Sequence, residues 1–90
     1  SRAMTDAESI EATILRLCAE RGAGKSICPS EVARAIAGPD ETVWRLLMRP
    51  VREAAFRLAR EGRLQVLRKG RPIVPEQARG VIRLTLGSTS

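Results

Sequence analysis

The hydrophobic period of this chain changes once, close to Gly62, and this change limits the folds open to it. Before Gly62, apolar residues recur at steps of three and four, which is the spacing of amphipathic helices. After it come two β-prone segments, 64–68 and 81–86, which a stretch rich in Gly and Pro separates, and in the second Ile82, Leu84 and Leu86 alternate with Val81, Arg83 and Thr85. Ninety residues leave room for one domain. We therefore expect helices first and a closing β-hairpin after them.

A first helix is expected near the N-terminus. Thr5 and Glu8 have the spacing of a capping box, and Gly22 is typical of a helix C-terminus. The apolar residues between them share one helical face: Ala7, Ile10, Ile14, Leu17 and Cys18. Residues 25–28 follow as a short link that could add a stub of strand.

A second helix is expected to begin at Pro29, because proline suits the first helical position and Glu31 favours the positive end of the helix. Gly38 and Pro39 end this segment. Its inner face consists of Val32, Ala33 and Ile36.

A third helical segment begins after Asp40, which is a good N-cap. Its inner stripe consists of Val43, Leu47, Val51, Ala55 and Leu58. Pro50 interrupts the stripe, and a proline inside a helix costs about 3 kcal/mol, whereas the first turn tolerates it. Either the helix is kinked, or it consists of a short helix over about 41–48 and a main helix over about 50–61. Trp44 is expected to anchor the core or the contact between helices.

The element order is helix, strand stub, helix, helix, strand, loop and strand. It is the order of a winged helix-turn-helix, a mainly α fold that combines a three-helix bundle with a small antiparallel β-hairpin, the wing. In this interpretation the third helix is the recognition helix, and the wing has a long tip at 69–80. The domain spans residues 5–86. Residues 1–4 are expected to be a disordered N-terminus or a remnant of the expression vector, and residues 87–90 a polar tail.

Charge is distributed unevenly along the chain. Residues 42–90 contain eleven Lys or Arg and three acidic residues, whereas residues 1–41 contain five basic and seven acidic residues. A domain with one basic half can neutralise a polyanion, so double-stranded DNA is the first partner to consider.

Two groups of residues are the candidate DNA contacts. On a helical wheel, the outer face of the third segment collects Arg52, Phe56, Arg57 and Arg60, and Arg45 and Arg49 join it if the helix runs unbroken through Pro50. The wing adds Arg68, Lys69, Arg71 and Arg79. Arginines on a recognition helix suit phosphate contact and guanine readout, and basic wing residues suit phosphates or the minor groove. The alternative is a solvated surface, on which Glu53 pairs with Arg57 and the wing charges only protect strand edges.

A second function is also consistent with the pattern. Phe56 with its neighbouring arginines could form the docking face of a protein–protein interaction module, because aromatic residues and Arg are enriched in interface hot spots. A homodimer or another protein would then be the partner. Phe56 could equally fold back against the hairpin, and a packing role is slightly favoured.

An enzyme is not expected. The chain has no His, and its two cysteines belong to no C-x-x-C motif, so neither a His-activated nucleophile nor a zinc site is apparent. The segment 22–26 resembles the end of a phosphate-binding loop, but Ala19 stands where that motif needs Gly. We therefore expect no metal and no small-molecule cofactor. With no signal peptide or membrane-spanning apolar run, a cytoplasmic protein with reduced thiols is expected.

Several motifs together resemble a known family. They are I-C-P-S-E-V-A-R at 27–34, W-R-x-L-M at 44–48, V-R-x-A-A at 51–55, K-G-x-P at 69–72 and G-x-I-R-L at 80–84. The pattern is similar to that of a small bacterial family of domains of unknown function with winged-helix character. The resemblance covers about residues 10–86. It implies a winged-helix fold and no particular activity.

Overall fold

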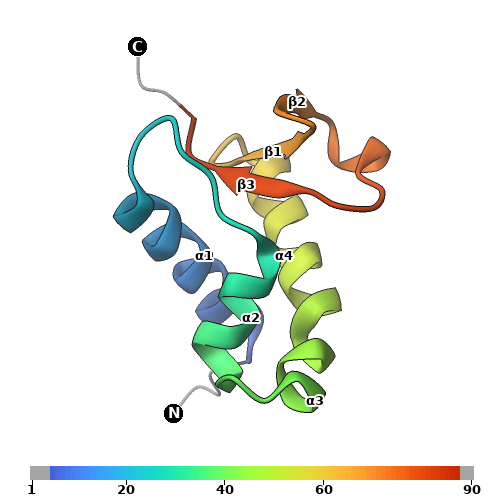
Figure 1. The fold of residues 1–90 in the computed structure, drawn as a ribbon. Helices are drawn as coiled ribbons and strands as arrows, with labels where there is room; N and C mark the ends of the chain where they lie inside the picture. Colours follow the sequence, from blue (N-terminus) through green and yellow to red (C-terminus); the bar gives the residue numbers. More distant parts are fainter. Residues whose placement is uncertain (1–4, 88–90) are drawn as a thin grey trace.

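Three longer helices lie beneath a small antiparallel sheet in the computed structural model, which describes residues 5–87 (Figure 1). The expectations for 1–4 and 88–90 lie outside the described residues. The elements are α1 (Ala7–Arg21), α2 (Pro29–Ala37), α3 (Glu41–Trp44), the 3₁₀ turn η1 (Arg45–Leu47), α4 (Met48–Arg60), β1 (Gln65–Arg68), β2 (Arg71–Ile73), the 3₁₀ turn η2 (Pro75–Gln77) and β3 (Arg83–Thr85). The mainly helical class with a small antiparallel sheet is thus confirmed. None of the helices within residues 5–87 has the length and apolar character to cross a membrane.

Helix α1 begins one residue later than expected. Asp6, not Thr5, is the N-cap, and its Oδ1 accepts a hydrogen bond from the Ser9 N–H at 2.8 Å. An Asp competes well for this position, so the helix takes its carboxylate as the cap. Ala7 is exposed as a consequence, and the buried face consists of Ile10, Ile14 and Cys18.

Helix α2 and the strand stub before it follow the sequence prediction. Ile27 forms an isolated antiparallel bridge with Leu84, with both N–H···O distances at 2.8 Å. Pro29 occupies the first turn of α2, and the N-cap Cys28 donates its N–H to the Glu31 carboxylate at 2.8 Å. The stub therefore ties the start of α2 to β3.

The third helical segment is divided, as one of the two alternatives predicted. The single turn α3 passes into η1, and α4 then begins at Met48, so Pro50 lies in the first turn of α4. There its missing N–H breaks no helical hydrogen bond. The 3₁₀ turn changes the helical phase, and Val43 is therefore 43% exposed, contrary to its predicted inner position.

The predicted long wing tip is wrong. Residues 71–73 form β2, which pairs with β1 across a two-residue turn at Lys69 and Gly70, whose φ angles are 52° and 79°. Two positive φ values are typical of the tight turns that join antiparallel strands. The sequence did not indicate this strand because Pro72 disfavours a strand prediction. Pro72 is tolerated here because β2 is an edge strand of the sheet.

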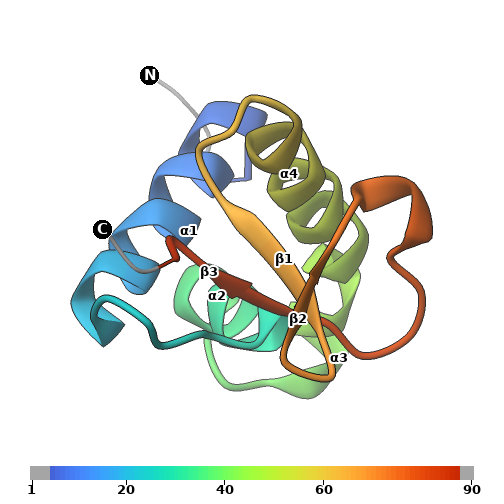
Figure 2. The ribbon, with the colours of Figure 1, turned by 90° about the horizontal axis from the view of Figure 1, so that it is seen from above.

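Strand β3 pairs with the other edge of β1, which gives the order β2-β1-β3. Seen from above, the strands cross over the helices (Figure 2). The predicted alternation holds for Ile82 and Leu84, which are buried, and is reversed afterwards, because Thr85 is buried and Leu86 is exposed. The Thr85 hydroxyl donates to the Lys25 carbonyl at 2.6 Å, so this buried polar group has a hydrogen-bond partner.

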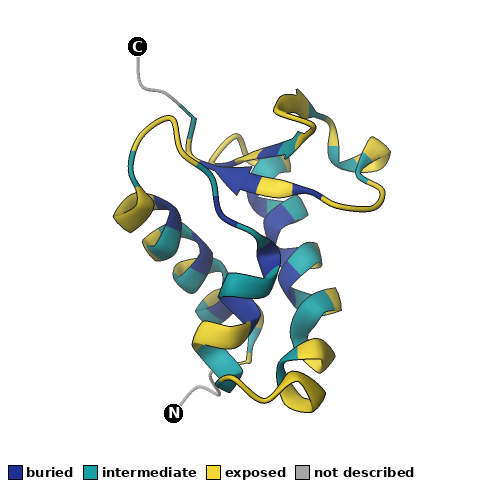
Figure 3. Cartoon of the chain, viewed as in Figure 1, coloured by how far each residue is buried: buried dark blue, intermediate teal, exposed yellow. Residues whose placement is uncertain are grey.

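The core lies between the three helices and the underside of the sheet, as the buried residues in Figure 3 show. α4 contributes Val51, Ala54, Ala55 and Leu58 to it. Trp44 packs against its edge, half-buried, with the Arg34 guanidinium 5.4 Å from the ring centroid. This confirms its predicted anchoring role. The upper face of the sheet and the segment around α3 are left exposed.

Candidate nucleic-acid interface

The middle of the predicted α4 face is joined to the loop before β3. Arg52 donates to the carbonyls of Gly80 at 3.1 Å and Ala78 at 3.4 Å, and its guanidinium lies 5.6 Å from the centroid of the Phe56 ring. Phe56 is half-buried and packs against the core. Phe56 therefore takes the packing role that was slightly favoured, and Arg52 fastens the loop before β3 to α4.

Three other arginines predicted to face DNA are in ion pairs. Arg57 donates to Glu11 of α1 at 2.8 Å, and Arg60 lies 3.4 Å from Glu76 of η2. Arg45 pairs with Glu41, one helical turn earlier. The expected pair of Glu53 with Arg57 is wrong, because Arg57 reaches α1 instead. The α4 stripe thus does not form one open row of cations.

The segment from the last residue of β1 to the loop after η2, residues 68–79, is different, and we call it the arm. Its four basic side chains, Arg68, Lys69, Arg71 and Arg79, are exposed and make no side-chain hydrogen bond or ion pair with any of residues 5–87. Within the same residues, the other basic side chains without such a partner are Lys25 and Arg49. Four of these six cations therefore lie on the arm.

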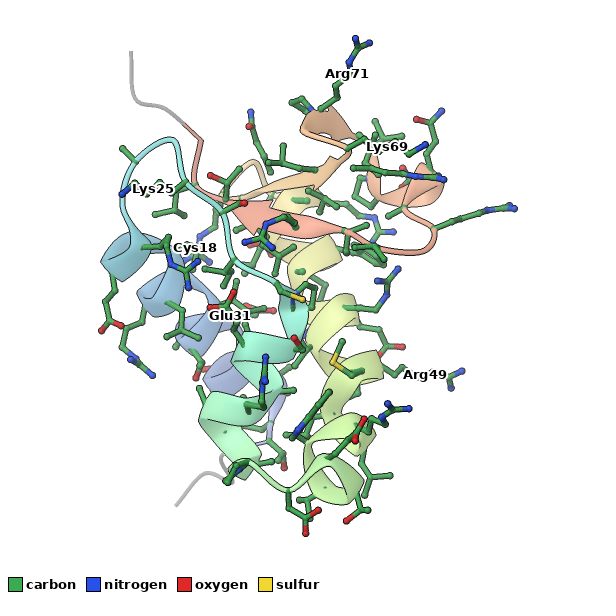
Figure 4. The ribbon with its side chains drawn as sticks, in the orientation of Figure 1. Cys18, Lys25, Glu31, Arg49, Lys69 and Arg71 are labelled. Atoms are coloured by element: carbon green, nitrogen blue, oxygen red, sulfur yellow. The ribbon has the colours of Figure 1, made fainter. Side chains whose placement is uncertain are left out.

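Figure 4 places some of these free cations. Lys69 and Arg71 lie at the end of the molecule that the β1–β2 hairpin forms, and Arg49 points outward from the first turn of α4 on the same side of the view. Lys25 lies on the opposite side, in the loop after α1. Of the labelled free cations, Lys69, Arg71 and Arg49 thus share one side of this view, and Lys25 lies on the other.

A shallow hollow of about 510 Å³ lies on the outer side of the sheet. It is lined by Ser26, Leu67, Arg68, Lys69, Gly70, Val81 and Arg83. Arg83 donates from Nε to the Ser26 hydroxyl at 2.7 Å and from Nη2 to the Ser26 carbonyl at 2.9 Å. Sequence reasoning assigned no role to Ser26. Ser26 and Arg83 are 57 residues apart in the sequence, so no local sequence pattern could have predicted their contact.

A smaller hollow of about 200 Å³ lies between the start of α2, α4 and the approach to β3, lined in part by Cys28, Met48 and Arg52. Cys28 is half-buried, whereas Cys18 lies in the core. Burial raises the pKa of the Cys18 thiol to about 11, although Arg21 nearby lowers it and Glu31 adds to the rise. Cys18 is therefore protonated at neutral pH. No cluster of His, Cys, Asp or Glu within residues 5–87 could hold a metal ion.

The start of α2 carries one perturbed carboxylate. Burial raises the pKa of Glu31, but the Cys28 N–H, the Arg21 guanidinium and the charge of Arg83 outweigh this and hold the pKa below its usual value. Arg21 binds one Glu31 oxygen and the Cys28 N–H binds the other. Both oxygens of this carboxylate are thus occupied within the fold.

Comparison with known proteins shows to which family the chain belongs. A search of curated proteins found no match to the chain. A family model described as "Protein of unknown function (DUF3253)" matches residues 7–87, which include every helix and strand of the structure. The small family of domains of unknown function inferred from the sequence motifs is thereby confirmed: the chain belongs to the DUF3253 family.

Proposed function

We propose that this domain is a winged helix that binds double-stranded DNA without catalysing a reaction, and that the arm is its wing and principal contact. The strand stub before α2, the helix pair α2 and α4, and the closing antiparallel sheet are the parts such a fold requires. The observation that carries the proposal is the group of four cations on residues 68–79 that have no side-chain partner among the described residues.

A free cation has an energetic advantage over a paired one in binding phosphate. An unpaired guanidinium or ammonium group loses no protein contact when it meets a phosphate, whereas a paired one gives up an interaction worth about 0.2–1 kcal/mol. Because most cations of the α4 face are paired, we propose that contacts from the arm to the DNA backbone dominate. Backbone contacts position a protein but carry no sequence information, so modest sequence preference is expected.

Salt dependence tests the proposal. Fluorescence anisotropy of a labelled 20-base-pair duplex should show an affinity that falls with a log–log slope of about −4 to −5, since the four arm cations and Arg49 can each neutralise one phosphate. The double variant Arg68→Gln/Lys69→Gln should make this slope shallower by about 2.

The matched control is Arg16→Gln/Lys25→Gln, which changes the net charge equally. Arg16 is paired with Glu20, and Lys25 lies away from the arm (Figure 4). This control should keep the slope of the unmodified protein. A slope near zero, or an equal change in both variants, would contradict DNA binding through the arm.

The alternative, a protein–protein interaction module, is favoured by a different observation from the one the sequence suggested. Phe56 is packed, but Leu46 of η1 is 76% exposed, and Val43 is exposed one turn before it. An exposed apolar pair of this kind could serve as a docking contact. Light scattering of the unmodified protein and of Leu46→Gln distinguishes this alternative: a dimer that only the variant loses would support it.

A further inference from the structure

We propose that the hollow on the outer face of the sheet is a binding site for a small organic anion that carries an apolar group. Its lining comes from the β1–β2 turn, from β3 and the residues before it, and from the link before α2; Figure 2 shows where these segments lie in the fold. Its volume of about 510 Å³ is within the range of roughly 300–1,000 Å³ that small-molecule sites occupy. The helices lie on the other side of the sheet, so occupying the site does not disturb the core.

The floor of the site is apolar. Leu67 of β1 and Arg83 of β3 are register partners, so the two side chains emerge beside each other on the same face of the sheet. Val81 is 84% exposed at the edge of the hollow, which is the greatest exposure of any large apolar residue described. Contact with an apolar ligand group would remove Leu67 and Val81 from water.

The rim of the site is cationic, and one cation is held in place. Both hydrogen bonds from Arg83 end on Ser26, a neutral residue, so its positive charge is not cancelled there. A guanidinium has five N–H donors, and two are used, which leaves three for a ligand. Arg68 and Lys69 add two charges with no partner in residues 5–87.

The nearby carboxylate makes no hydrogen bond with Arg83. Glu31 lies within electrostatic range of Arg83, but Arg21 and the Cys28 N–H bind its two oxygens. Arg83 is thus a fixed cation beside an apolar floor. A carboxylate or phosphate monoester with one ring or a short acyl chain matches this arrangement, whereas a neutral or cationic ligand does not.

The site also has a regulatory consequence, which rests on the proposed DNA binding. Arg68 and Lys69 line the hollow and belong to the arm, so a bound anion would engage cations that are proposed to contact DNA. A small anion and a duplex would then compete. The anion site itself is tested without DNA, so the two proposals can fail separately.

Titration by ¹H–¹⁵N NMR spectroscopy tests the site with four probes: phenyl phosphate, phenylacetate, inorganic phosphate and benzyl alcohol. The two organic anions should give saturable shifts at the amides of Leu67, Gly70 and Arg83, and the tighter one identifies the preferred anionic group. Inorganic phosphate lacks the apolar group, and benzyl alcohol lacks the charge. Both should bind at least about tenfold more weakly, since each loses one class of contact.

Variants locate the site. Arg83→Gln should raise the Kd of phenyl phosphate about tenfold, as expected for the loss of a charge-assisted hydrogen bond. Val81→Ser should raise it about threefold, by the loss of apolar contact at an exposed position that folding does not require. Arg79→Gln, an arm residue outside the hollow, should leave the Kd within about twofold.

Three outcomes would overturn the site: inorganic phosphate that binds as well as phenyl phosphate, shifts that are the same with benzyl alcohol, or affinities that are equal in Arg79→Gln and Arg83→Gln. If Arg83→Gln does not fold, Val81→Ser decides, because unchanged affinity in that variant contradicts an apolar floor. Ser26→Ala adds a second measure. It keeps the charge of Arg83 and removes one anchor, so an intermediate loss of affinity is expected.

Discussion

The outer face of α4 and the arm are both rich in arginine, yet the structure uses the two regions differently. On α4, Arg57 reaches Glu11 of α1, Arg60 reaches Glu76 of η2, and Arg52 holds the loop before β3. On the arm, the four cations have no partner within residues 5–87. The comparison teaches that the number of arginines on a helical face does not measure the charge available to a ligand. The charge available depends on where the fold brings the carboxylates.

The largest effect should come from removing the four charges of the arm, compared with removing four paired charges elsewhere. Arg68→Gln/Lys69→Gln/Arg71→Gln/Arg79→Gln should lower duplex affinity at 0.1 M salt about a hundredfold or more, because four phosphate contacts are lost. The matched quadruple variant replaces paired arginines: Arg45, Arg57, Arg60 and Arg63, each to Gln. Its affinity should fall less than about tenfold, measured by anisotropy in the same buffer, since only long-range attraction is lost. Equal losses in the two variants would remove the distinction between the regions.

The next effect concerns the core beneath both regions. The Cys18 thiol lies beneath β3, 3.8 Å from the Leu84 carbonyl, and burial raises its pKa to about 11. The thiol is neutral in both states below pH 8, so its contribution is complete there. As the pH rises from about 9 to 11, the unfolded chain loses this proton first, and stability falls by about 2 kcal/mol.

Urea unfolding at pH 8, 9.5 and 10.5 measures this loss, and Cys18→Ala is the control, because its stability should not show the same decline. At pH 8, iodoacetamide should label Cys28 and leave Cys18 unmodified, as mass spectrometry of the folded protein would show. Labelling of Cys18 at the same rate as Cys28 would mean that β3 and α1 separate readily. The arm would then have no rigid base.

A smaller effect should come from the link between α4 and α1. The Glu11 side chain is 20% exposed, and its bond to Arg57 at 2.8 Å is partly protected from water. A double-mutant cycle with Glu11→Gln and Arg57→Gln should give a coupling energy of about 1 kcal/mol, at the upper end for surface pairs. The same cycle on Arg16 and Glu20, which are both more than half exposed, should give less than about 0.5 kcal/mol. Coupling energies in the reverse order would show that Arg57 is effectively free.

Local patterns in the sequence were sufficient for much of this fold. Pro29, Asp40 and Gly22 mark helix ends through local backbone chemistry, and each lies where the sequence predicted. Pro50 similarly divides the third segment at a position that its missing N–H dictates. The element order follows from these signals.

The features missed depend on contacts between distant segments. The partner of Arg57 is 46 residues away in sequence, and the anchor of Arg83 is 57 residues away. Strand β2 lacks a strand-like sequence around Pro72, and it forms because the turn at Lys69 and Gly70 brings it against β1. The candidate DNA contacts could therefore be chosen by residue type from the sequence. Whether each cation is free could not be predicted, because that depends on tertiary pairing.

The smallest predicted effect is a gain rather than a loss, and it tests whether the α4 face lies close enough to DNA to contribute. Glu76→Gln removes the carboxylate 3.4 Å from Arg60 and so adds one free cation beside the arm. Duplex affinity should rise about two- to threefold at 0.1 M salt, with a salt slope steeper by less than 1, because Arg60 would meet a phosphate only part of the time. Glu20→Gln makes the same change of net charge on α1, where it frees Arg16, and should leave affinity within about 1.5-fold. An equal gain in both variants would attribute the effect to net charge alone. No gain with Glu76→Gln would place Arg60 away from the duplex, so that the arm and Arg49 would be the only contacts proposed for this domain.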